Sequence, residues 1–264
     1  MGTVIIIPAR YASTRYPGKP LATLRGADGV AKTLIQRSWE AAMAVVGVER
    51  VIVATDDARI SDHAKEFGAE VAMTSSDCAN GTERCADALA GLGAAEIIVN
   101  LQGDAPLTPP WFVEALIDAM HRRPEIAVCT PVLRCDEEAL AGFIADRRAG
   151  RVGGTTAVFD ETGRALYFSK EVLPYMGDAG DSRECPVFHH VGVYAYRPDA
   201  LRAYIAMSPG RLEQREGLEQ LRFLERGGQV HCVEVDARGA GFWELNNPED
   251  VPRIERMLKE RGLA

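Results

Sequence analysis

Short apolar runs alternate with stretches of helical periodicity along the first half of the chain. The apolar runs have strand length, and the stretches between them repeat apolar residues at helical spacing, as Ile35, Trp39 and Met43 do. The pattern predicts strands at residues 4–7, 51–54, 70–73 and 97–101, and helices at residues 32–46, 60–67 and 81–91. Strands that alternate with helices in this way build a mostly parallel sheet with helices on both faces, so the predicted fold class is α/β.

The second half of the chain has a different pattern. Residues 157–160 and 165–169 flank Glu161-Thr162-Gly163-Arg164, which predicts a β-hairpin. Residues 189–196 alternate as a strand does, residues 230–235 form an apolar strand, and residues 212–226 and 248–263 have helical periodicity. No internal repeat or obvious linker interrupts the chain. We therefore expect one domain over residues 1–264, in which the later segments extend the sheet and add a smaller layer.

Composition and charge narrow the class of protein. The 264 residues are 47% hydrophobic, which favours a globular chain with a substantial core. Acidic residues outnumber basic ones by 38 to 30, and the net charge of −8 argues against a general nucleic-acid or anionic-membrane binder. No apolar run approaches the roughly 20 residues that span a bilayer, and no signal-peptide pattern is present. We expect a cytoplasmic protein that binds neither nucleic acid nor membrane.

The cysteines do not indicate a metal site. None of them forms a C-x-x-C pair, which zinc sites commonly use. A chain of this length does not need disulfides, so we expect free thiols in a reducing compartment at Cys78, Cys85, Cys129, Cys135, Cys185 and Cys232.

A basic loop follows the first predicted strand. It carries Arg10, Arg15 and Lys19 among small polar residues such as Ser13. Guanidinium groups bind phosphate bidentately and a lysine acts as a compact point charge, so the loop is a candidate polyphosphate site. An ordinary solvated basic loop has the same composition, and charge alone does not separate the two interpretations.

Two further polar clusters follow predicted strands. Thr55-Asp56-Asp57 comes after residues 51–54, and Gln102-Gly103-Asp104 comes after residues 97–101. Because ligands bind at the carboxyl ends of parallel strands, we expect both clusters to converge with the basic loop. Asp104 is the first candidate for chemistry, since a carboxylate there can hold Mg²⁺ against a nucleotide phosphate. The alternative is an aspartate that caps the turn before Pro106.

Several common motifs of α/β proteins are missing from the sequence. The chain has no G-x-x-x-x-G-K-[ST] phosphate loop and no G-x-G-x-x-G after the first strand. It also lacks the G-x-S-x-G elbow of α/β-hydrolases. These absences narrow the possible classes of protein and argue against an α/β-hydrolase.

Eight segments, spread over nearly the whole chain, carry a resemblance to one known family. They are IIIPARYASTRYPGKPLATL at 5–24, VIVATDD at 51–57, GTER at 81–84, IVNLQGDAP at 98–106, ALYFSK at 165–170, HVGVYAYR at 190–197, LEQREGLEQLRFL at 212–224 and NPED at 247–250. In this order they resemble the CMP-Kdo synthetases (3-deoxy-manno-octulosonate cytidylyltransferases), which are sugar-activating nucleotidyltransferases. Each motif alone is weak, whereas the set is highly specific. The resemblance implies a Rossmann-like nucleotidyltransferase sheet with a smaller sugar-facing layer, in which residues 1–120 mainly bind CTP and residues 121–264 mainly bind the sugar and a second subunit.

The resemblance also implies an activity and a set of site residues. The family transfers CMP from CTP to the anomeric hydroxyl of the acid sugar Kdo, releases pyrophosphate and requires Mg²⁺; its product feeds lipopolysaccharide or capsule synthesis, and its members are typically homodimers. The implied catalytic residues are Arg10, Arg15, Lys19 and Asp104, and the implied nucleotide-binding residues are Ala9, Ser13, Thr74, Gly81, Thr82 and Arg84. The implied sugar-binding residues are Gln102, His190, Glu213 and Gln220, and the implied metal ligands are Asp104 and Asn246.

Some of the implied residues have an ordinary structural alternative. His190, on an alternating strand, fits a hydrogen-bonded core histidine as well as a sugar contact. Glu213, Glu216 and Gln220 have near-helical spacing, which also fits a solvated helix face.

The chain departs from the family pattern at Asn246, where the family usually has a second metal-binding aspartate. An amide oxygen can bind Mg²⁺ but brings no charge, so we expect a lower metal affinity. The departures lie mostly in the sugar-facing half, which leaves open an amino-Kdo or a nonulosonic acid as the acceptor, or a nucleotide-binding homologue with impaired catalysis. Retention of Arg15, Lys19 and Asp104 favours an active enzyme.

Overall fold

The computed structural model describes residues 2–12, 16–152, 154–176 and 185–264. The chain divides into two compact units. The first comprises Met1–Glu114 and Ala237–Ala264, and the second comprises Ala115–Asp236. The chain leaves the first unit within helix α4 (Pro110–Arg122) and returns to it after Asp236.

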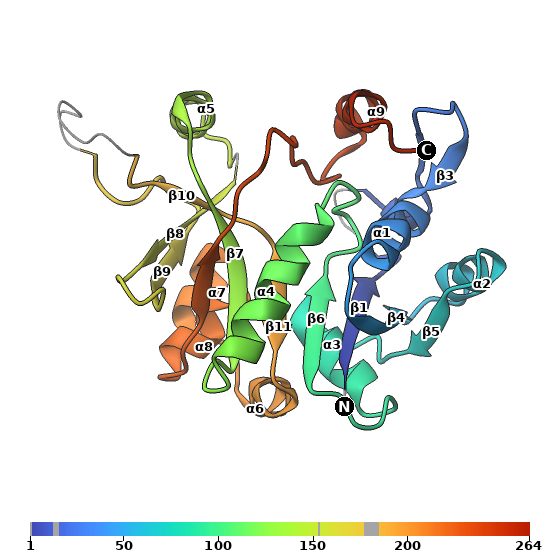
Figure 1. Ribbon diagram of the computed structural model, residues 1–264, viewed down its shortest axis with the longest axis horizontal. Helices are drawn as coiled ribbons and strands as arrows, with labels where there is room; N and C mark the ends of the chain where they lie inside the picture. The colour runs from blue at the N-terminus through green and yellow to red at the C-terminus, as the bar shows by residue number, and fades with distance from the viewer. Residues whose placement is uncertain (1, 13–15, 153, 177–184) are drawn as a thin grey trace. The chain divides into compact units, whose positions relative to one another are not determined.

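Parallel strands form the sheet of the first unit. β1 (Thr3–Ala9) pairs in parallel with β4 (Val48–Thr55) on one side and with β6 (Ile97–Leu101) on the other, and β5 (Glu70–Met73) pairs with β4 (Figure 1). The consecutive residues 5–7 of β1 are all fully buried, which requires cover on both faces because successive side chains point to opposite faces. The predicted α/β class is confirmed, and β5 and β6 have the predicted bounds.

A polar cap begins each of three helices of the first unit. Thr33, Asp57 and Asn80 accept hydrogen bonds from backbone N–H groups two or three residues further on. They precede α1 (Leu34–Met43), α2 (Ala58–Glu66) and α3 (Gly81–Leu89). The helix predicted at residues 32–46 is therefore wrong at both ends, since Ala31–Thr33 pairs as β3 with β2 (Thr23–Arg25) and α1 ends at Met43.

The second unit has a mixed sheet around β7 (Val128–Arg134). β7 pairs antiparallel with β10 (Phe188–His190) and β11 (Val193–Tyr196), and in parallel with β12 (His231–Glu234). β8 (Thr155–Phe159) pairs antiparallel with β10 and with β9 (Ala165–Ser169), which confirms the predicted hairpin. Antiparallel pairs thus predominate in this unit.

Two elements predicted as continuous are interrupted in the second unit. Residues 189–196 form β10 and β11 because a tight turn, in which the Val193 N–H donates to the Val191 carbonyl at 2.7 Å, separates them. Residues 212–226 form α7 (Arg211–Glu216) and α8 (Leu221–Glu225), since Gly217 adopts the left-handed conformation with φ 64° and ends the first helix.

Further elements lie where the sequence pattern gave no prediction. They include α4, β7, α5 (Glu137–Arg148) and α6 (Pro198–Ala206). α5 contains no fully buried residue, which explains why its apolar periodicity is too weak to recognise. α6 starts with Pro198 at its first position, where the missing N–H leaves no helical hydrogen bond unmade.

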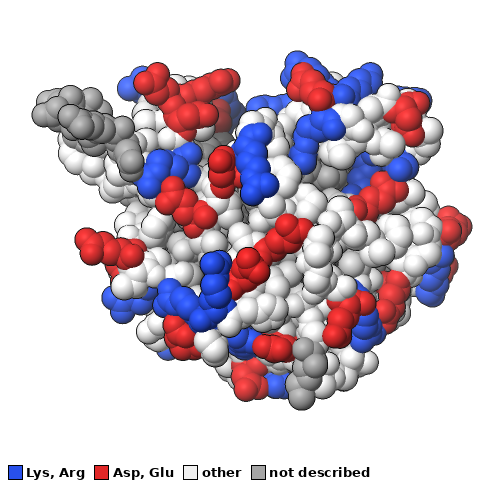
Figure 2. Space-filling model, in the orientation of Figure 1, with Lys and Arg blue, Asp and Glu red and all other residues white. Residues whose placement is uncertain are grey.

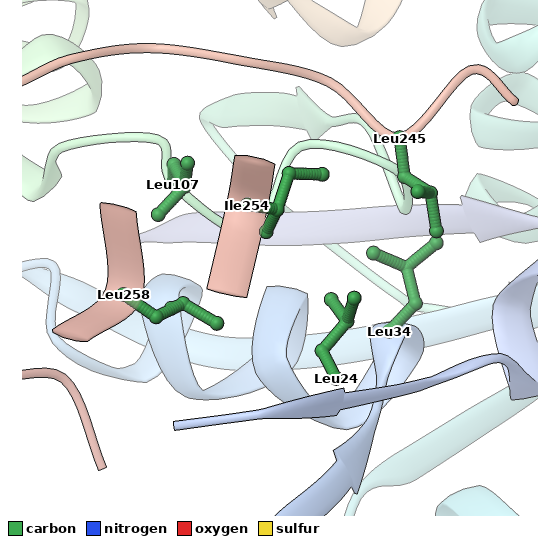
Figure 3. Packing of buried hydrophobic residues seen from close by; sticks show 6 residues of the cluster. All are labelled: Leu24, Leu34, Leu107, Leu245, Ile254 and Leu258. Carbon is green, nitrogen blue, oxygen red and sulfur yellow. The ribbon is translucent and has the colours of Figure 1, made fainter. Parts of the chain in front are cut away.

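Residues 237–264 complete the first unit around an apolar cluster. After the short 3₁₀ helix η2 (Pro248–Asp250), α9 (Val251–Glu260) contributes Ile254 and Leu258 to it (Figure 3). The other buried members come from β2, from α1, from the segment after β6 and from the segment before η2, and are Leu24, Leu34, Leu107 and Leu245. Burying one such side chain stabilises a fold by about 1.5–3 kcal/mol, so the cluster ties the C-terminal residues firmly to the loops that follow β1 and β6.

The surface carries charges of both signs. Figure 2 shows Lys and Arg side chains interspersed with Asp and Glu side chains over the visible face. Among the described residues, no helix is long and apolar enough to cross a membrane. The cysteines are free thiols, as predicted.

β1 and β6 approach each other closely at their carboxyl ends. A Cβ atom at Gly103 would lie 2.7 Å from the Pro8 carbonyl oxygen, which is closer than non-bonded atoms pack. Ser38 of α1 donates a hydrogen bond to the Gly103 carbonyl at 3.0 Å, which holds the segment in place from one face. Only glycine fits at this position, and its close approach fixes where the residues after both strands lie.

The Gly103→Ala substitution is expected to destabilise the protein by about 1–3 kcal/mol, because the added methyl group overpacks against backbone that cannot move away. Denaturant unfolding measures the change. Gly142→Ala is the matched control: this glycine lies inside α5 with open space around its Cβ position, so alanine should stabilise the protein by roughly 0.5–1 kcal/mol. Equal effects of the two substitutions would contradict the close approach of β1 and β6.

Candidate functional site

A cavity of about 310 Å³ lies in the first unit where its strands end. Its walls come from the end of β1, from the 3₁₀ helix η1 (Lys19–Leu21), from the start of α3 and from the turn after β6. The lining residues that the sequence singled out are Ala9, Arg10, Lys19, Gly81, Arg84, Gln102 and Asp104. The predicted convergence of the strand ends is therefore present in the first unit.

The strand register explains this convergence. β1 pairs with β6 so that Ile6 lies beside Asn100. Both strands run on to the same edge of the sheet, where Gly103 lies against the Pro8 carbonyl. The residues that follow β1 and β6 therefore meet at this edge, although they are far apart in the sequence.

Lys19 and Asp104 form the central ion pair of the cavity. The Lys19 Nζ lies 2.5 Å from the Asp104 Oδ2, and both side chains are largely shielded from solvent. The backbone of Asp104 is fixed as well, since its carbonyl accepts a hydrogen bond from the Leu245 N–H at 2.9 Å. An ammonium group and a carboxylate are thus held together in a cavity that the Arg10 side chain also lines.

Arg84 provides a second, buried cation at the cavity. Its side chain is 3% exposed, and its Nη1 donates to the Thr74 Oγ1 at 2.6 Å. The same nitrogen lies 3.1 Å from the Asp56 Oδ1 in an ion pair that lacks the alignment of a hydrogen bond. The pairing of β4 with β5 explains the contact, because it ends with Thr55 beside Met73 and brings the next residues, Asp56 and Thr74, together.

The start of α3 supplies backbone groups to the cavity wall. Asn80 caps this helix through its side-chain oxygen, and Asn80 and Gly81 both line the cavity. The N-terminus of a helix favours anions because its first N–H groups lack helical partners and its dipole is positive there. Thr82 is buried at 1% exposure one residue further on.

The segment around Asn246 is anchored close to the Asp104 backbone. Leu245, its preceding residue, makes the hydrogen bond to Asp104 described above. The Asn246 and Asn247 N–H groups both donate to the Asp250 Oδ2, at 2.9 and 2.7 Å. The Asp250 carboxylate therefore shapes this segment and is committed to it.

The second unit groups His190, Tyr194 and Gln220. The rings of His190 and Tyr194 lie 5.5 Å apart, and the Tyr194 hydroxyl donates to the Gln220 Oε1 at 3.0 Å. The His190 Nε2 lies 2.9 Å from the Thr130 Oγ1. Among the residues that the structure describes, the buried Gln220 Nε2 has no hydrogen-bond partner, so this amide retains a donor for a further group.

Glu213 occupies a different environment in the same unit. Its carboxylate accepts two hydrogen bonds from Arg222, at 2.7 and 2.6 Å, and both side chains are buried. Glu216 accepts from the Ser169 hydroxyl at 2.7 Å. A solvated helix face, which the spacing also allowed, is thus wrong for Glu213 and for Gln220, because both are buried.

Some predicted site residues lie outside the described part of the chain. These are Ser13 and Arg15 of the basic loop. Their roles stay predictions. The beginning of that loop is described, and there the Arg59 guanidinium lies 3.3 Å above the Tyr11 ring while its nitrogens bind Asp57. The hydrogen bonds from Arg59 lower the pKa of the Asp57 carboxyl below its ordinary value.

Sequence reasoning missed two features of the site. The role of Asp56 as the partner of Arg84 was not predicted, although its position after an apolar strand was noted. Asn100 is a fully buried amide inside β6, beside the cavity-lining turn. The available signal was a lone polar residue within the otherwise apolar strand Ile97–Leu101.

The fold and comparison with known proteins identify the class of protein to which the chain belongs. The fold, with cations and a carboxylate at the ends of parallel strands, is that of a nucleotide-binding α/β protein. The family model described as "Cytidylyltransferase" matches residues 4–234. This match covers most of the chain and includes every strand described above apart from Thr3, the first residue of β1.

Similar proteins specify the family further. The chain is 42% identical to 3-deoxy-manno-octulosonate cytidylyltransferase of Maricaulis maris, over 99% of both sequences. It is 36% identical to the mitochondrial protein of that name in Arabidopsis thaliana, over 98% of this chain and 84% of the plant protein. A solved structure of CMP:2-keto-3-deoxy-manno-octonic acid synthetase complexed with CTP superimposes with a TM-score of 0.84 at 34% identity, covering 99% of this chain and 100% of that one. The chain belongs to the 3-deoxy-manno-octulosonate cytidylyltransferase family.

The environment of His190 leads to a prediction about pH and stability. Burial, with a smaller effect of neighbouring His189, lowers the pKa of His190 from 6.5 to about 3. The unfolded chain therefore binds a proton more readily than the folded one, so the stability is full above pH 6.5 and is lost as the pH falls towards 3. At pH 4.5 the loss through this one residue should be roughly 2–3 kcal/mol relative to pH 7.

Urea unfolding of the wild-type protein and of His190→Gln, at pH 7 and pH 4.5, measures this effect. The wild-type protein should lose roughly 2–3 kcal/mol more than the variant between the two pH values. Identical losses would mean that His190 is protonated as easily in the folded protein as in the unfolded chain.

Proposed function

We propose that this protein transfers CMP from CTP to the anomeric hydroxyl of Kdo and releases pyrophosphate. The observation that carries the proposal is the cavity in which Arg10, Lys19 and Arg84 line the same space as Asp104, in a chain that aligns over nearly its full length with a CTP-bound synthetase. An α/β-hydrolase or a dinucleotide-binding Rossmann enzyme has no comparable support, since the G-x-S-x-G and G-x-G-x-x-G motifs are missing from the sequence.

The cations of the cavity suit a triphosphate. The side chains of Arg10 and Lys19 and the start of α3 all line the cavity and would bind phosphate oxygens. The sugar hydroxyl oxygen forms a bond to the α-phosphorus, the bond from that phosphorus to the bridging oxygen of the β-phosphate breaks, and the hydroxyl proton leaves to solvent. Such a transfer depends mainly on positioning and charge stabilisation, and it needs no covalent enzyme intermediate.

Mg²⁺ fits the donors at this site. Asp104 places a carboxylate among the predicted phosphate-binding side chains, and Mg²⁺ is commonly held by one or two carboxylates together with substrate phosphates. Asn246 follows Leu245, whose N–H binds the Asp104 carbonyl, so its amide oxygen belongs to the same part of the first unit. Bound Mg²⁺ would neutralise phosphate charge during the transfer.

The second unit offers polar groups for a sugar with many hydroxyls. The Gln220 Nε2 is an available donor. The Tyr194 hydroxyl donates to the Oε1 of the same amide, and the His190 ring lies beside the Tyr194 ring. Glu213 is better placed to hold Arg222 than to meet a ligand, because both carboxylate oxygens already accept from that guanidinium. We therefore propose His190 and Gln220 as sugar contacts and Glu213 as a residue that shapes the site.

The remaining parts of the proposal rest on the family resemblance. They are a homodimer, a cytoplasmic location and a role in lipopolysaccharide or capsule synthesis. Because the departures from the family pattern lie mostly in the sugar-facing half, a related acid sugar, such as an amino-Kdo or a nonulosonic acid, is a second candidate acceptor.

Asp104→Ala should lower the rate of pyrophosphate release from CTP and Kdo by about 100-fold or more, because it removes the charged oxygens proposed to hold Mg²⁺. A coupled pyrophosphate assay measures the rate. Asp118→Asn, which removes one carboxylate from the exposed face of α4, is the control and should keep the wild-type rate. Comparable rates for Asp104→Ala and the wild-type protein would rule out the proposed role.

Asn246→Asp should lower the Mg²⁺ concentration that gives half-maximal activity by roughly 3–10-fold, since a charged oxygen binds the cation more tightly than an amide oxygen does. Asn247→Asp adds the same charge one residue further on and serves as the control, because aspartate also caps η2 well. If both variants respond to Mg²⁺ alike, the effect comes from net charge and Asn246 is not a ligand.

A further inference from the structure

Asn100 is anomalous within its strand. It lies in β6 between Val99 and Leu101, it is fully buried, and neither its Oδ1 nor its Nδ2 has a hydrogen-bond partner within the described parts of the chain. Most buried side-chain amides are paired, because an unpaired one loses its hydration without compensation. A buried amide with both ends unmatched therefore calls for an explanation outside the packing of β6.

The space beside Gly81 brings Asn100 and Gln102 together. A Cβ atom at Gly81 would lie 3.2 Å from the Asn100 Nδ2 and 3.0 Å from the Gln102 Nε2. The two amides therefore border one small space that the glycine leaves free at the start of α3. Their positions, two residues apart, place both side chains towards the same face of the sheet.

The two amides differ in their access to the cavity. Gln102 lines the cavity and is partly exposed, so a ligand can reach it. Asn100 is fully buried and is not among the lining residues, so it can act only through a neighbour. Gln102 is the neighbour that borders the same space. The oxygen and the NH₂ group of its amide have similar shapes, but the oxygen accepts hydrogen bonds and the NH₂ group donates them.

We infer that Asn100 is a positioning residue that fixes the orientation of the Gln102 amide when the acceptor sugar binds. The inference rests on the proposed function. Both amides border the empty Cβ position of Gly81, so a ligand that turns Gln102 towards this space turns it towards the Asn100 amide. With one end of Gln102 paired to Asn100 in the bound state, the other end is presented to the sugar. In the protein without ligand, the unpaired Asn100 amide lowers the stability of the fold, and such local costs are common at functional sites.

The distinguishing test is a double-mutant cycle between Asn100→Leu and Gln102→Ala. Leucine has the branching and heavy-atom number of asparagine without polar atoms, so this variant should have a Tm equal to or above that of the wild-type protein. It should raise the KM for Kdo about tenfold and leave the Kd for CTP, measured by calorimetry, within twofold of the wild-type value. In the Gln102→Ala background it should have no further effect on that KM.

Two further variants guard against a purely structural effect. Ile98→Val alters a buried residue on the same face of β6 and should lower the Tm while keeping the wild-type KM for Kdo. Asn100→Ala should raise that KM as the leucine variant does, even if leucine proves too large for the space.

Each remaining outcome overturns a specific statement. A wild-type KM in both Asn100 variants, or a KM that rises by the same factor with and without Gln102, would overturn the positioning role. A Tm well below wild type for Asn100→Leu, with an unchanged KM, would mean that this position affects the stability of the fold and not the binding of the sugar. A wild-type protein that releases no pyrophosphate with Kdo contradicts the proposed function itself. A wild-type protein that is active, with effects of Asn100→Leu and Gln102→Ala on the KM that are independent of each other, contradicts only the role of Asn100.

Discussion

Parallel pairing of β1 with β4 and β6 is the constraint on which the site in the first unit depends. The pairing is parallel, so all three strands end at one edge of the sheet, and each is followed by polar residues. It is also closely packed, because Gly103 leaves no room for a side chain beside the Pro8 carbonyl. These two facts fix where Asp104 follows β6, and the Lys19 Nζ lies 2.5 Å from its Oδ2.

The C-terminal residues secure the same edge from outside the sheet. Leu245 contributes both a hydrogen bond to the Asp104 carbonyl and a side chain to the apolar cluster with Ile254 and Leu258. The cluster is formed by burial, which is strong but not directional, while the hydrogen bond is directional. Together they hold the residue before Asn246 at a fixed place, and this explains how a segment so late in the chain can belong to the candidate metal site.

The sequence predicted the parts of the fold that follow from strong local patterns. Residues 70–73 and 97–101 were placed with their observed bounds because apolar runs of that length favour buried strands. Periodicity does not predict α5, because this helix buries no residue fully. It predicts one helix over residues 212–226, because the left-handed conformation of Gly217 leaves no mark on the spacing of apolar residues. Helix length and interruption depend on contacts and backbone conformation that spacing alone does not encode.

The candidate site could be predicted to a similar extent. Asp104, Lys19 and Arg10 were found because the ends of parallel strands converge, a rule that needs no knowledge of side-chain contacts. The contacts themselves were not available from the sequence. The pairing of Arg84 with Asp56, the burial of Glu213 against Arg222 and the unmatched amide of Asn100 all arise from tertiary packing.

Phosphorus NMR of one reaction mixture shows directly whether the protein transfers CMP to an acid sugar. With the protein, CTP, Mg²⁺ and Kdo present, we expect the three CTP resonances to give way to one phosphodiester resonance and to pyrophosphate in equal amounts. Omitting Kdo should leave CTP intact. Conversion of CTP to CDP and inorganic phosphate, or CTP that persists with Kdo present, would contradict the account.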